Sequence, residues 1–541
     1  MIEITNYWEK IEQLVTVETV NGITQKAYRN RPSSLVETFE SSVERFPNQA
    51  ALVHEAERVT YAELNEKVNQ AAYALKHVYG IQKGDTVALL LMNGIPFAIS
   101  VYAILKIGAI AVPLNTKLKS TELLGMLKDA NVKTVISNEE WWPQIEAIKD
   151  KLSINEFFIT SANPPAGTVS FDSLFNDGFG QTVNEDIFEQ DPAFIMYTSG
   201  TTGKPKGALI THRNMIHTCL NYTYCYRLTN FDSTLIAVPV FHITGLAAQL
   251  MTFIYLGGKI VLMSKFQPNQ FLSLLEKEKV SHVIASPTVY TMTLMERDYK
   301  NYNLSNWRVC AFGGAPMPVD TLIELKRWVP SLEFHNTYGL TETTSPATIM
   351  PDEHQHRKIH SVGVPTPVTE VKVVDPDTRQ ELGTNEIGEL MFKGPMVIEK
   401  YWNNEKATEE SIVNGWLATG DLALIDEEGF ITIMDRIKDM INRGGEKIYS
   451  VEVEDALYSH PSILEAAIVG VPDKQYGEVV KACIVVKPNE TLTEEEVKNW
   501  ISKRLAKYKV PAYVEFLEQL PRNPNGKVMK NLLRYIPKKI N

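Results

Sequence analysis

The sequence has little of what marks several special classes of protein. Its 541 residues include four cysteines, at positions 219, 225, 310 and 483, and no Cys-x-x-Cys pair, which argues against a disulfide framework and predicts buried, reduced thiols. No apolar run approaches the roughly 20 residues that span a bilayer. The first 20 residues hold four Glu and no basic segment before an apolar one, so no signal peptide is expected. These absences predict a cytoplasmic protein without a transmembrane segment.

An excess of positive charge is also absent. The net charge is −11, which excludes a surface built for nucleic acid. The charge is uneven, however, because residues 498–541 contain eleven Lys or Arg and two Glu, a net charge of +9. Such a segment is either a solvated basic face or a positive region that meets a polyphosphate. The motifs described below favour the second interpretation.

The first part of the chain alternates short apolar runs with longer helical segments. We expect strands at Val87–Leu91, Ala109–Leu114 and Val132–Ile136, a helix at Ile95–Ile107, and a helix capped by Ser120 that runs through residue 130. This order predicts a parallel, doubly wound α/β sheet. The pattern resumes between residues 193 and 338, with strands near Phe194–Tyr197, Thr234–Val238, Lys259–Leu262, His282–Ala285 and Trp307–Phe312.

After about residue 351 the pattern changes to short strands separated by turns, and then to an α+β segment. The expected strands are Val371–Val374, Glu389–Phe392, Phe430–Met434, Ala466–Val471 and Val480–Val486, and the expected helices are Val451–Ser459 and Glu494–Leu505, the second with Thr493 and Glu496 as a capping box. We therefore predict a large N-terminal domain of residues 1–435, with α/β subdomains at about 1–190 and 191–350 and a β unit at 351–435. A hinge at 436–439 precedes a small α+β C-terminal domain of residues 440–541.

The strongest local signal is the segment Tyr197–Gly207, which follows an apolar strand. Its three glycines permit backbone angles that aim successive N–H groups at an anion. Four hydroxyl groups and two lysines add donors and charge. Two residues separate Gly200 from Gly203 and a proline follows Lys204, so this is not a Walker-type loop. We interpret it as a loop that holds phosphates by another pattern.

Further motifs follow along the chain. The segment Phe312–Pro316 places two glycines after a strand, where a planar ring can lie on the backbone. The segment His335–Thr343 carries Glu342, a carboxylate suited to Mg²⁺ beside a nucleotide phosphate. The segment Gly415–Asp421 ends on a carboxylate that can accept hydrogen bonds from both hydroxyls of a ribose. The segment Pro521–Lys527 has two prolines and a glycine, a shaped turn that presents one lysine.

In this order the motifs resemble those of the AMP-forming acyl-CoA synthetases, adenylate-forming enzymes that include bacterial fatty-acid–CoA ligases, over about residues 35–535. The resemblance implies an acid–thiol ligase with Mg²⁺ as cofactor. It would convert a carboxylic acid, expected to be a fatty acid, and ATP into acyl-AMP and pyrophosphate, and would then transfer the acyl group to coenzyme A with release of AMP. It also implies a small C-terminal domain that is mobile. A homodimer is left open.

The resemblance assigns roles to individual residues. The nucleotide would be held by Thr198, Ser199, Gly200, Thr201, Thr202, Gly203, Lys204 and Lys206 at the β- and γ-phosphates, by Gly313, Gly314, Ala315, Pro316, Asn336, Thr337, Tyr338 and Gly339 around the adenine, and by Asp421 and Arg436 at the ribose. The reaction itself would depend on Thr341 at the α-phosphate, Glu342 at the metal and Lys527 at the reacting carboxylate. Lys438 would be the hinge, and Gly444 and Gly445 would belong to a loop that approaches the active site in the second half-reaction.

His242 has two interpretations. A single histidine in an apolar stretch is commonly a satisfied core residue. In similar synthetases this position lies between the acyl site and the thiol tunnel, so His242 would act as a gate. Amino-acid-activating relatives often carry Asp here to hold an ammonium group, and its absence favours an uncharged acyl chain. Leu246 stands where some bacterial long-chain members have a tryptophan gate, so the chain length of the acid stays open.

Two other functions compete with this prediction. A stand-alone adenylating enzyme would load the phosphopantetheine thiol of a carrier protein in trans. A nucleotide-binding regulator without catalysis is disfavoured because Lys527 and Glu342 are retained. The triplet His354, His356 and His360 lies in a polar loop without cysteine, and its spacing fits no standard zinc pattern.

Overall fold

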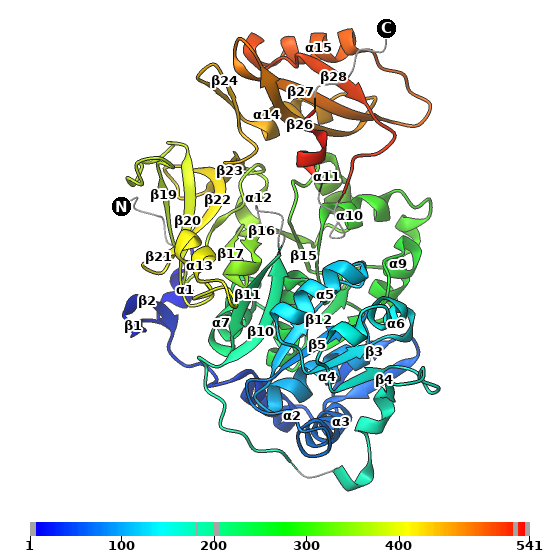
Figure 1. Cartoon of the computed structure of the whole chain (residues 1–541). Coiled ribbons are helices and arrows are strands. Elements are labelled where there is room, and N and C mark those ends of the chain that lie inside the picture. The colour runs from blue at the N-terminus through cyan, green and yellow to red at the C-terminus, as the bar shows by residue number, and fades with distance from the viewer. Residues whose placement is uncertain (1–6, 180–181, 199–204, 523–527, 536–541) are drawn as a thin grey trace. The chain divides into compact units, whose positions relative to one another are not determined.

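The computed structural model describes residues 7–179, 182–198, 205–522 and 528–535 (Figure 1). The described residues form two compact units. The large unit comprises residues 7–371 and 391–418, and the small unit comprises residues 372–390 and 419–535, each with the gaps just given. No helix of the described residues combines the length and apolarity that crossing a bilayer would require. The four cysteines are buried and free, as predicted.

The first sheet of the large unit has the strand order β11-β10-β6-β5-β7-β8-β9. Neighbouring strands are parallel except for the antiparallel pair β10 and β11. The strands are β5 (Thr86–Leu90), β6 (Ile110–Pro113), β7 (Thr134–Ser137), β8 (Glu156–Ile159), β9 (Val169–Ser170), β10 (Pro192–Thr198) and β11 (Lys206–Thr211). Strands β5, β6 and β7 are buried along their whole length, which is why the sequence shows them as continuous apolar runs.

The second sheet has the order β18-β17-β16-β15-β14-β12-β13-β3-β4 and is parallel from β16 to β3. Its strands are β3 (Ala50–His54), β4 (Glu57–Thr60), β12 (Ser233–Ile236), β13 (Lys259–Leu262), β14 (His282–Ala285), β15 (Val309–Gly313), β16 (Glu333–Leu340), β17 (Ser345–Ile349) and β18 (Val364–Pro365). Each sheet takes strands from both sides of residue 190: β10 and β11 join the first sheet, and β3 and β4 join the second. The expected division into subdomains at residue 190 therefore does not follow the sheets, because strand order along the chain leaves spatial neighbours undetermined.

Helices fill the space between the two sheets and cover their outer faces. The buried residues of the main core come from both sheets and from the helices between them, α2 (Leu35–Arg45), α3 (Tyr61–Tyr73), α4 (Ile95–Lys106), α7 (His212–Cys225), η6 (Thr244–Met251) and α8 (Thr252–Leu256). The outer face of the first sheet packs on α5 (Ser120–Asp129) and α6 (Trp142–Glu146). The outer face of the second sheet packs on α9 (Pro268–Lys277), α10 (Pro287–Leu294) and α11 (Val319–Trp328). The large unit is thus a layered α/β fold.

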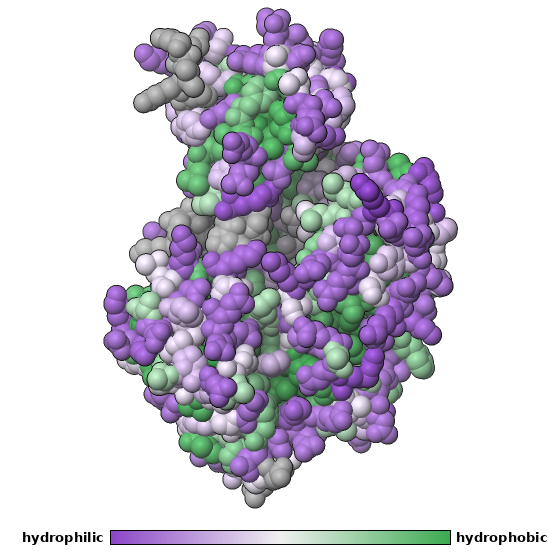
Figure 2. Space-filling model, turned by 90° about the vertical axis from the view of Figure 1, so that its right-hand side faces the viewer, coloured by the Kyte–Doolittle hydropathy of each residue, from purple (hydrophilic) through white to green (hydrophobic). Residues whose placement is uncertain are grey.

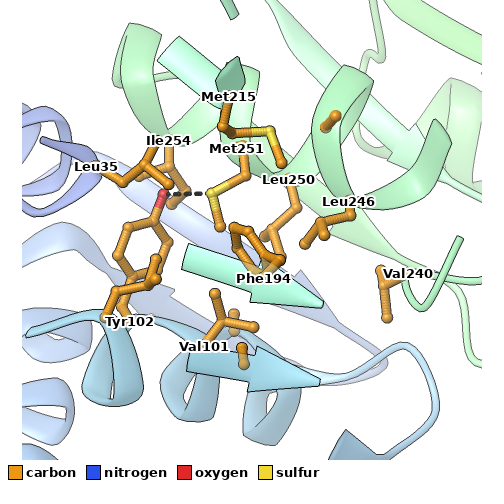
Figure 3. Packing of buried hydrophobic residues seen from close by; sticks show 14 of the residues in the cluster. Leu35, Val101, Tyr102, Phe194, Met215, Val240, Leu246, Leu250, Met251 and Ile254 are labelled. Atoms are coloured by element: carbon orange, nitrogen blue, oxygen red, sulfur yellow. Dashed lines mark hydrogen bonds between the residues drawn. The ribbon is translucent and has the colours of Figure 1, made fainter. Parts of the chain in front are cut away.

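Figure 3 shows the core between the sheets at close range. Tyr102 of α4 and Phe194 of β10 point toward Leu250 and Met251 of η6. The Tyr102 hydroxyl lies 3.3 Å from the Met251 sulfur. Because these side chains come from three regions of the sequence, this core fixes the position of η6 relative to the first sheet.

The small unit contains most of one sheet and the whole of a second, which is antiparallel except for the parallel pair of β27 and β28. The former has the order β19-β20-β22-β21 with β23 beside β22, and its strands β20 and β22 continue into the large unit. The latter has the order β25-β24-β27-β26 with β28 beside β27, and α14 and α15 pack on it. The elements are β19 (Glu370–Val374), β20 (Gly388–Lys393), β21 (Ile412–Val413), β22 (Trp416–Ile425), β23 (Ile431–Arg436), β24 (Ile441–Arg443), β25 (Glu446–Ile448), α14 (Ser450–Tyr458), β26 (Ile463–Asp473), β27 (Gly477–Val486), α15 (Glu494–Ser502) and β28 (Tyr513–Phe516). The predicted boundary at 436–439 falls inside this unit, so the domain limits stay a prediction.

Two helix starts were predicted from capping residues, with different results. Thr493 and Glu496 form the expected capping box, since the Thr493 amide and hydroxyl donate to the Glu496 carboxylate and the Glu496 amide donates back to the hydroxyl. Ser120, by contrast, is already the first residue of α5 and not its cap. The capping position belongs to Lys119, whose amide donates to Glu122 Oε2 at 3.0 Å. A carboxylate in the first turn thus replaces the serine hydroxyl that the sequence suggested.

The surface carries mostly polar residues. Figure 2 shows one face of the molecule, on which polar side chains predominate and apolar residues occupy smaller areas. This agrees with the mean hydropathy of −0.15.

Candidate active site

Glu342 of the large unit is contacted by residues from two distant segments of the chain, one at Thr198 and one at Ile398–Tyr401. It lies in η8 (Thr341–Thr343), a short turn directly after β16. Its Oε1 accepts a hydrogen bond from Thr198 Oγ1 at 3.2 Å and another from Tyr401 Oη at 3.0 Å. Its main-chain carbonyl accepts from the Ile398 amide at 2.9 Å. Two side chains therefore hold one oxygen of this carboxylate, close to the ends of β10 and β16.

Strand pairing brings a lysine to the same place. In the antiparallel pair of β10 and β11, Thr198 is opposite Lys206, so the two ends of the predicted phosphate loop are held together. The Lys206 ammonium lies 5.2 Å from the centre of the Tyr401 ring. Ser199, Gly200, Thr201, Thr202, Gly203 and Lys204 lie outside the described residues. The residues that flank the loop thus lie near Glu342, Thr198 by a hydrogen bond to its carboxylate and Lys206 over the ring of Tyr401, and the phosphate-binding role of the loop stays a prediction.

Tyr401 is a residue that the sequence did not reveal. It pairs with Ala208 of β11 through an isolated bridge, and its side chain is 6% exposed. Burial, together with the Glu342 carboxylate, raises the pKa of Tyr401 well above its usual range. The phenol therefore stays protonated and acts as a donor to Glu342. Its only sequence signal is an aromatic pair with Trp402, which has no specific meaning by itself.

The turn that carries Glu342 has unusual backbone geometry. Thr344 and Ser345 directly after it have φ values of +50° and +90°, which side-chain-bearing residues seldom adopt. A Cβ on Gly339 would lie 1.7 Å from the Ser345 carbonyl oxygen, so this position requires glycine. The Thr344 carbonyl accepts from Thr218 of α7 at 2.8 Å, and the Ser345 hydroxyl lies 2.7 Å from that of Tyr222. Contacts with α7 thus stabilise a strained turn.

The predicted adenine-binding segments lie on adjacent strands. Strands β15 and β16 are parallel, with Gly313 opposite Thr337, and a Cβ on Gly313 would lie 2.2 Å from the Thr337 carbonyl oxygen. Gly314 has a φ of +78° and opens the exposed loop that holds Ala315 and Pro316. Tyr338 is half-buried, with its ring centre 6.1 Å from that of Phe392. Because parallel strands end at one edge, the structure brings these segments together, and their role in binding adenine stays a prediction.

Asn336 and Thr337, two of the residues predicted to surround the adenine, make hydrogen bonds that hold β16 in place. The Asn336 amide group donates to the Ser361 carbonyl at 2.8 Å, and the Thr337 hydroxyl lies 2.6 Å from that of Tyr226. These side chains fix β16 against its neighbours. Thr341 is half-buried next to Glu342, and its carbonyl accepts from the Thr344 amide at 3.0 Å.

His242 lies in the turn before η6. Its ring is half-buried, with its centre 4.8 Å from that of Phe241, and its carbonyl accepts from the Leu246 amide at 3.0 Å. The segment η6 is a π-helix, a wider coil that is rare and frequent at functional sites. A Cβ on Gly245 would lie 2.6 Å from the Pro239 carbonyl oxygen, so the turn passes close to this helix. The sequence did not predict the π-helix.

The small unit brings together the predicted ribose ligands. Asp421 of β22 is opposite Arg436 of β23, and their side chains form an ion pair with Arg436 Nε 3.1 Å from Asp421 Oδ1. Asp421 is 4% exposed. Lys438 is exposed in the turn after β23. Gly444 and Gly445, with φ values of +60° and +96°, form the turn between β24 and β25. Lys527 lies outside the described residues.

Comparison with known proteins decides the family. The family model "AMP-binding enzyme" matches residues 39–402, and "AMP-binding enzyme C-terminal domain" matches residues 452–527. A feruloyl-CoA synthase from Amycolatopsis is 34% identical over 90% of this chain and 96% of its own length. A long-chain-fatty-acid–CoA ligase from Mycobacterium tuberculosis is 35% identical over 88% of this chain and 93% of its own. The chain belongs to the AMP-binding enzyme family.

Solved structures agree with this assignment. The o-succinylbenzoate CoA synthetase of Bacillus subtilis, bound to its acyl-adenylate intermediate, matches with a TM-score of 0.83 and 32% identity, over 94% of this chain and 99% of that one. The same enzyme has also been solved with ATP and a magnesium ion. This member of the AMP-binding family is an AMP-forming acyl-CoA ligase with the α/β fold that the sequence predicted. ATP, CoA and a small carboxylic acid are substrates that fit the family.

The residues around Glu342 fit a magnesium ion. Both hydrogen bonds that other described side chains make to this carboxylate end on Oε1. Mg²⁺ is commonly held by one or two carboxylates together with water and substrate phosphates, so a single carboxylate beside a phosphate loop suffices. Within the described ranges, no three His, Cys, Asp or Glu side chains gather to hold a metal without such a partner. His354 instead contacts Arg357 and the ring of Tyr7.

Proposed function

We propose that this ligase activates a carboxylic acid with an uncharged, apolar chain, a fatty acid in the first instance, and transfers it to CoA. The observation that carries this proposal is the composition of residues 240–251, which include His242 and η6 and contain no Asp, Glu, Lys or Arg. Leu246, Leu250 and Met251 are buried in this segment (Figure 3). A charged tail beside it would lose its hydration without gaining a counter-charge.

Two relatives support the apolar acid. One is named a long-chain-fatty-acid–CoA ligase and another a feruloyl-CoA synthase. Because of the feruloyl-CoA synthase, an aromatic acid is the most informative substrate to compare with a fatty acid. A cytoplasmic location remains a prediction of the sequence.

In the first half-reaction, an ionised carboxylate oxygen attacks the α-phosphorus of ATP, and the bond to the bridging oxygen breaks to release pyrophosphate. The nucleophile needs no general base, because it is already an anion. The barrier is the approach of two anions, so catalysis consists of positioning and charge neutralisation. Positioning and charge neutralisation would come from Lys206, the loop residues up to Lys204, Thr341 and Lys527. The ribose would be held by Asp421 and Arg436. When bound at Glu342, Mg²⁺ would neutralise phosphate charge.

In the second half-reaction, the CoA sulfur attacks the acyl carbon of acyl-AMP, and AMP leaves with the bonding electrons. We propose that Lys438 is the hinge for this step, that the turn at Gly444 and Gly445 serves the thiol, and that His242 acts as a gate. Gly444 and Gly445 both have positive φ values, which permits a tight, projecting turn. A carrier-protein thiol in place of CoA is the alternative acceptor.

One experiment tests the proposal. A panel of acids is scored by ATP-dependent pyrophosphate release and by thioester formation with CoA or with a phosphopantetheine-loaded carrier protein. It should contain fatty acids of increasing length, a hydroxycinnamic acid, an amino acid and a dicarboxylic acid. We expect a fatty acid to give the highest kcat/KM with free CoA. Selective turnover of the dicarboxylic acid or amino acid would contradict the apolar assignment, and thioester formed only on the carrier would contradict CoA as acceptor.

A further inference from the structure

The last described segment of the small unit contacts the predicted hinge directly. Arg534 Nη2 donates to the Lys438 carbonyl at 2.7 Å and lies 2.8 Å from Asp439 Oδ1. The guanidinium is about one-third exposed and the carboxylate 13% exposed. One guanidinium nitrogen therefore contacts both the main chain of Lys438 and the side chain of Asp439.

The backbone around Arg534 is itself held by a buried ammonium group. Lys481 of β27 is fully buried, and its Nζ donates to the carbonyls of Leu533 and Tyr535 at 3.0 and 2.9 Å. These are the two residues that flank Arg534. Lys481 is neutralised by Glu515, 2.6 Å away, and lies over the Tyr535 ring. This network fixes the backbone on both sides of Arg534, because moving residues 533–535 would cost the buried ammonium group two of its hydrogen bonds.

A second contact from the same segment reaches the other end of the turn. Lys530 is the first residue of η10 (Lys530–Leu533; red in Figure 1), which packs against β26. Its Nζ lies 2.7 Å from the Ser450 hydroxyl and 2.7 Å from Glu454. The Ser450 hydroxyl and amide in turn donate to the carboxylate of Asp435, which is 3% exposed. Residues 530–534 thus contact Asp439 directly and Asp435 through Ser450.

Between these contacts the turn closes on itself. The Asp439 and Met440 amides both donate to the Arg436 carbonyl, at 2.9 and 3.0 Å. Changing φ and ψ at Lys438 would re-aim its carbonyl and so break the bond from Arg534. A hydrogen bond to a charged group at a partly exposed site favours the bonded form by roughly tenfold.

We propose that Arg534 is a latch for the hinge: a positioning residue that stabilises this conformation of the turn and must release it whenever Lys438 changes conformation. The proposal rests on the proposed function, in which Lys438 is the hinge. It adds that the segment Lys530–Arg534 contacts the stretch that contains the hinge. Arg534 contacts no substrate in this role.

The test uses the full chain with Arg534→Gln, which removes the charge and keeps a polar side chain. Arg504→Gln is the matched control, because Arg504 is also exposed and also donates to a main-chain carbonyl, that of Trp500, within the same unit. Hydrogen exchange is measured at the Asp439 and Met440 amides. Single-turnover rates are measured separately for pyrophosphate release and for thioester formation from preformed acyl-AMP.

We expect Arg534→Gln to speed exchange at both amides about tenfold and to change the ratio of the two single-turnover rates by a similar factor. We expect Arg504→Gln to alter neither quantity by more than about twofold, and Arg534→Lys to restore part of the ratio. Unchanged exchange in Arg534→Gln would overturn the latch. Faster exchange with an unchanged rate ratio would also overturn it, because the contact would then be structural only. Failure of the ligase assignment shows itself separately, as a wild-type chain that forms no acyl-AMP or thioester with any acid.

Discussion

The Tyr401 hydroxyl donates to Glu342 Oε1 at 3.0 Å, although 59 residues separate the two in the chain. Thr198 donates to the same oxygen, so both hydrogen bonds that described side chains make to this carboxylate end on Oε1. A carboxylate held in this way has one oxygen committed to orientation and the other available for a cation. Tyr401 is thus a positioning residue for Glu342.

Replacing Tyr401 with Phe should weaken metal-dependent adenylation. Loss of a hydrogen bond to a charged group costs about 1–3 kcal/mol, and the site is partly buried, so we expect single-turnover pyrophosphate release to drop by roughly 5- to 150-fold. We also expect a higher Mg²⁺ concentration for half-maximal rate. The measurement is a magnesium titration of that rate.

The chain offers a matched control for this variant. Tyr299 donates to Glu324 at 2.5 Å in another part of the large unit, so Tyr299→Phe removes the same kind of bond. We expect its magnesium titration to match the wild type. Equal titration curves for Tyr401→Phe and the wild type would refute the positioning role.

The candidate site shows which residues a sequence can reveal. Glu342 and the ends of the phosphate loop were recognised because glycines, hydroxyls and a carboxylate stand close together in short motifs. Tyr401 was missed because it lies beside Glu342 only in the folded chain, where its backbone pairs with Ala208. No local sequence motif indicates that pairing. The π-helix η6 was missed because its composition, rich in Leu and Ala, does not distinguish it from an α-helix.

In the fold, too, the sequence predicts single strands but not which strands pair. Strands β13 and β14 have the predicted limits, Lys259–Leu262 and His282–Ala285, since each is a short, fully or largely buried apolar run. Their sheet partners were not predictable, because β13 pairs with β3 more than 200 positions earlier in the chain, at Ile260 and Leu52 for example. Pairing of this kind depends on the packing of the whole unit.

Gly339 should tolerate no side chain. An added Cβ would meet the Ser345 carbonyl at 1.7 Å, so Gly339→Ala must displace the turn that holds Glu342. We expect a loss of about 1–3 kcal/mol in the free energy of unfolding and a lower adenylation rate. Gly125→Ala is the control, because a Cβ in the middle of α5 meets nothing within 4 Å and should raise stability by up to about 1 kcal/mol. Denaturant unfolding of both variants gives the comparison, and an unfolding midpoint unchanged by Gly339→Ala would be inconsistent with this geometry.

Lys527 should be required for acyl-AMP formation. Its removal leaves the charge that develops around the α-phosphate without its cation, and by analogy with a lost oxyanion donor Lys527→Ala should cost about 2–4 kcal/mol of transition-state stabilisation. Lys503→Ala is the control, since Lys503 is an exposed lysine of the same basic region. Pyrophosphate release is the measurement, with a melting curve to show that folding is unchanged. A wild-type rate in Lys527→Ala would remove this residue from the mechanism.

Asp421 should recognise the ribose of ATP. Asp421→Ala leaves ribose hydroxyls without an acceptor, so the ATP KM should rise by the equivalent of about 1–3 kcal/mol. An ATP analogue without the 2′ and 3′ hydroxyls separates this effect from a loss of the ion pair with Arg436. The wild type should discriminate strongly against the analogue, whereas the variant should bind both nucleotides about equally. If the variant discriminates as well as the wild type does, another residue holds the ribose.

Lys438 should act as the hinge between the two half-reactions. Proline fixes φ near −65° and disfavours helical backbone at the preceding residue, so Lys438→Pro should hold the turn in one conformation. If that conformation is the adenylating one, single-turnover pyrophosphate release survives while thioester formation collapses. Lys438→Ala removes the charge but leaves φ free, and it should keep the ratio of the two rates near that of the wild type. A folding defect would lower both rates together and shift the melting curve. Should Lys438→Pro make acyl-CoA at the wild-type rate, the hinge must lie elsewhere between Asp435 and Gly445.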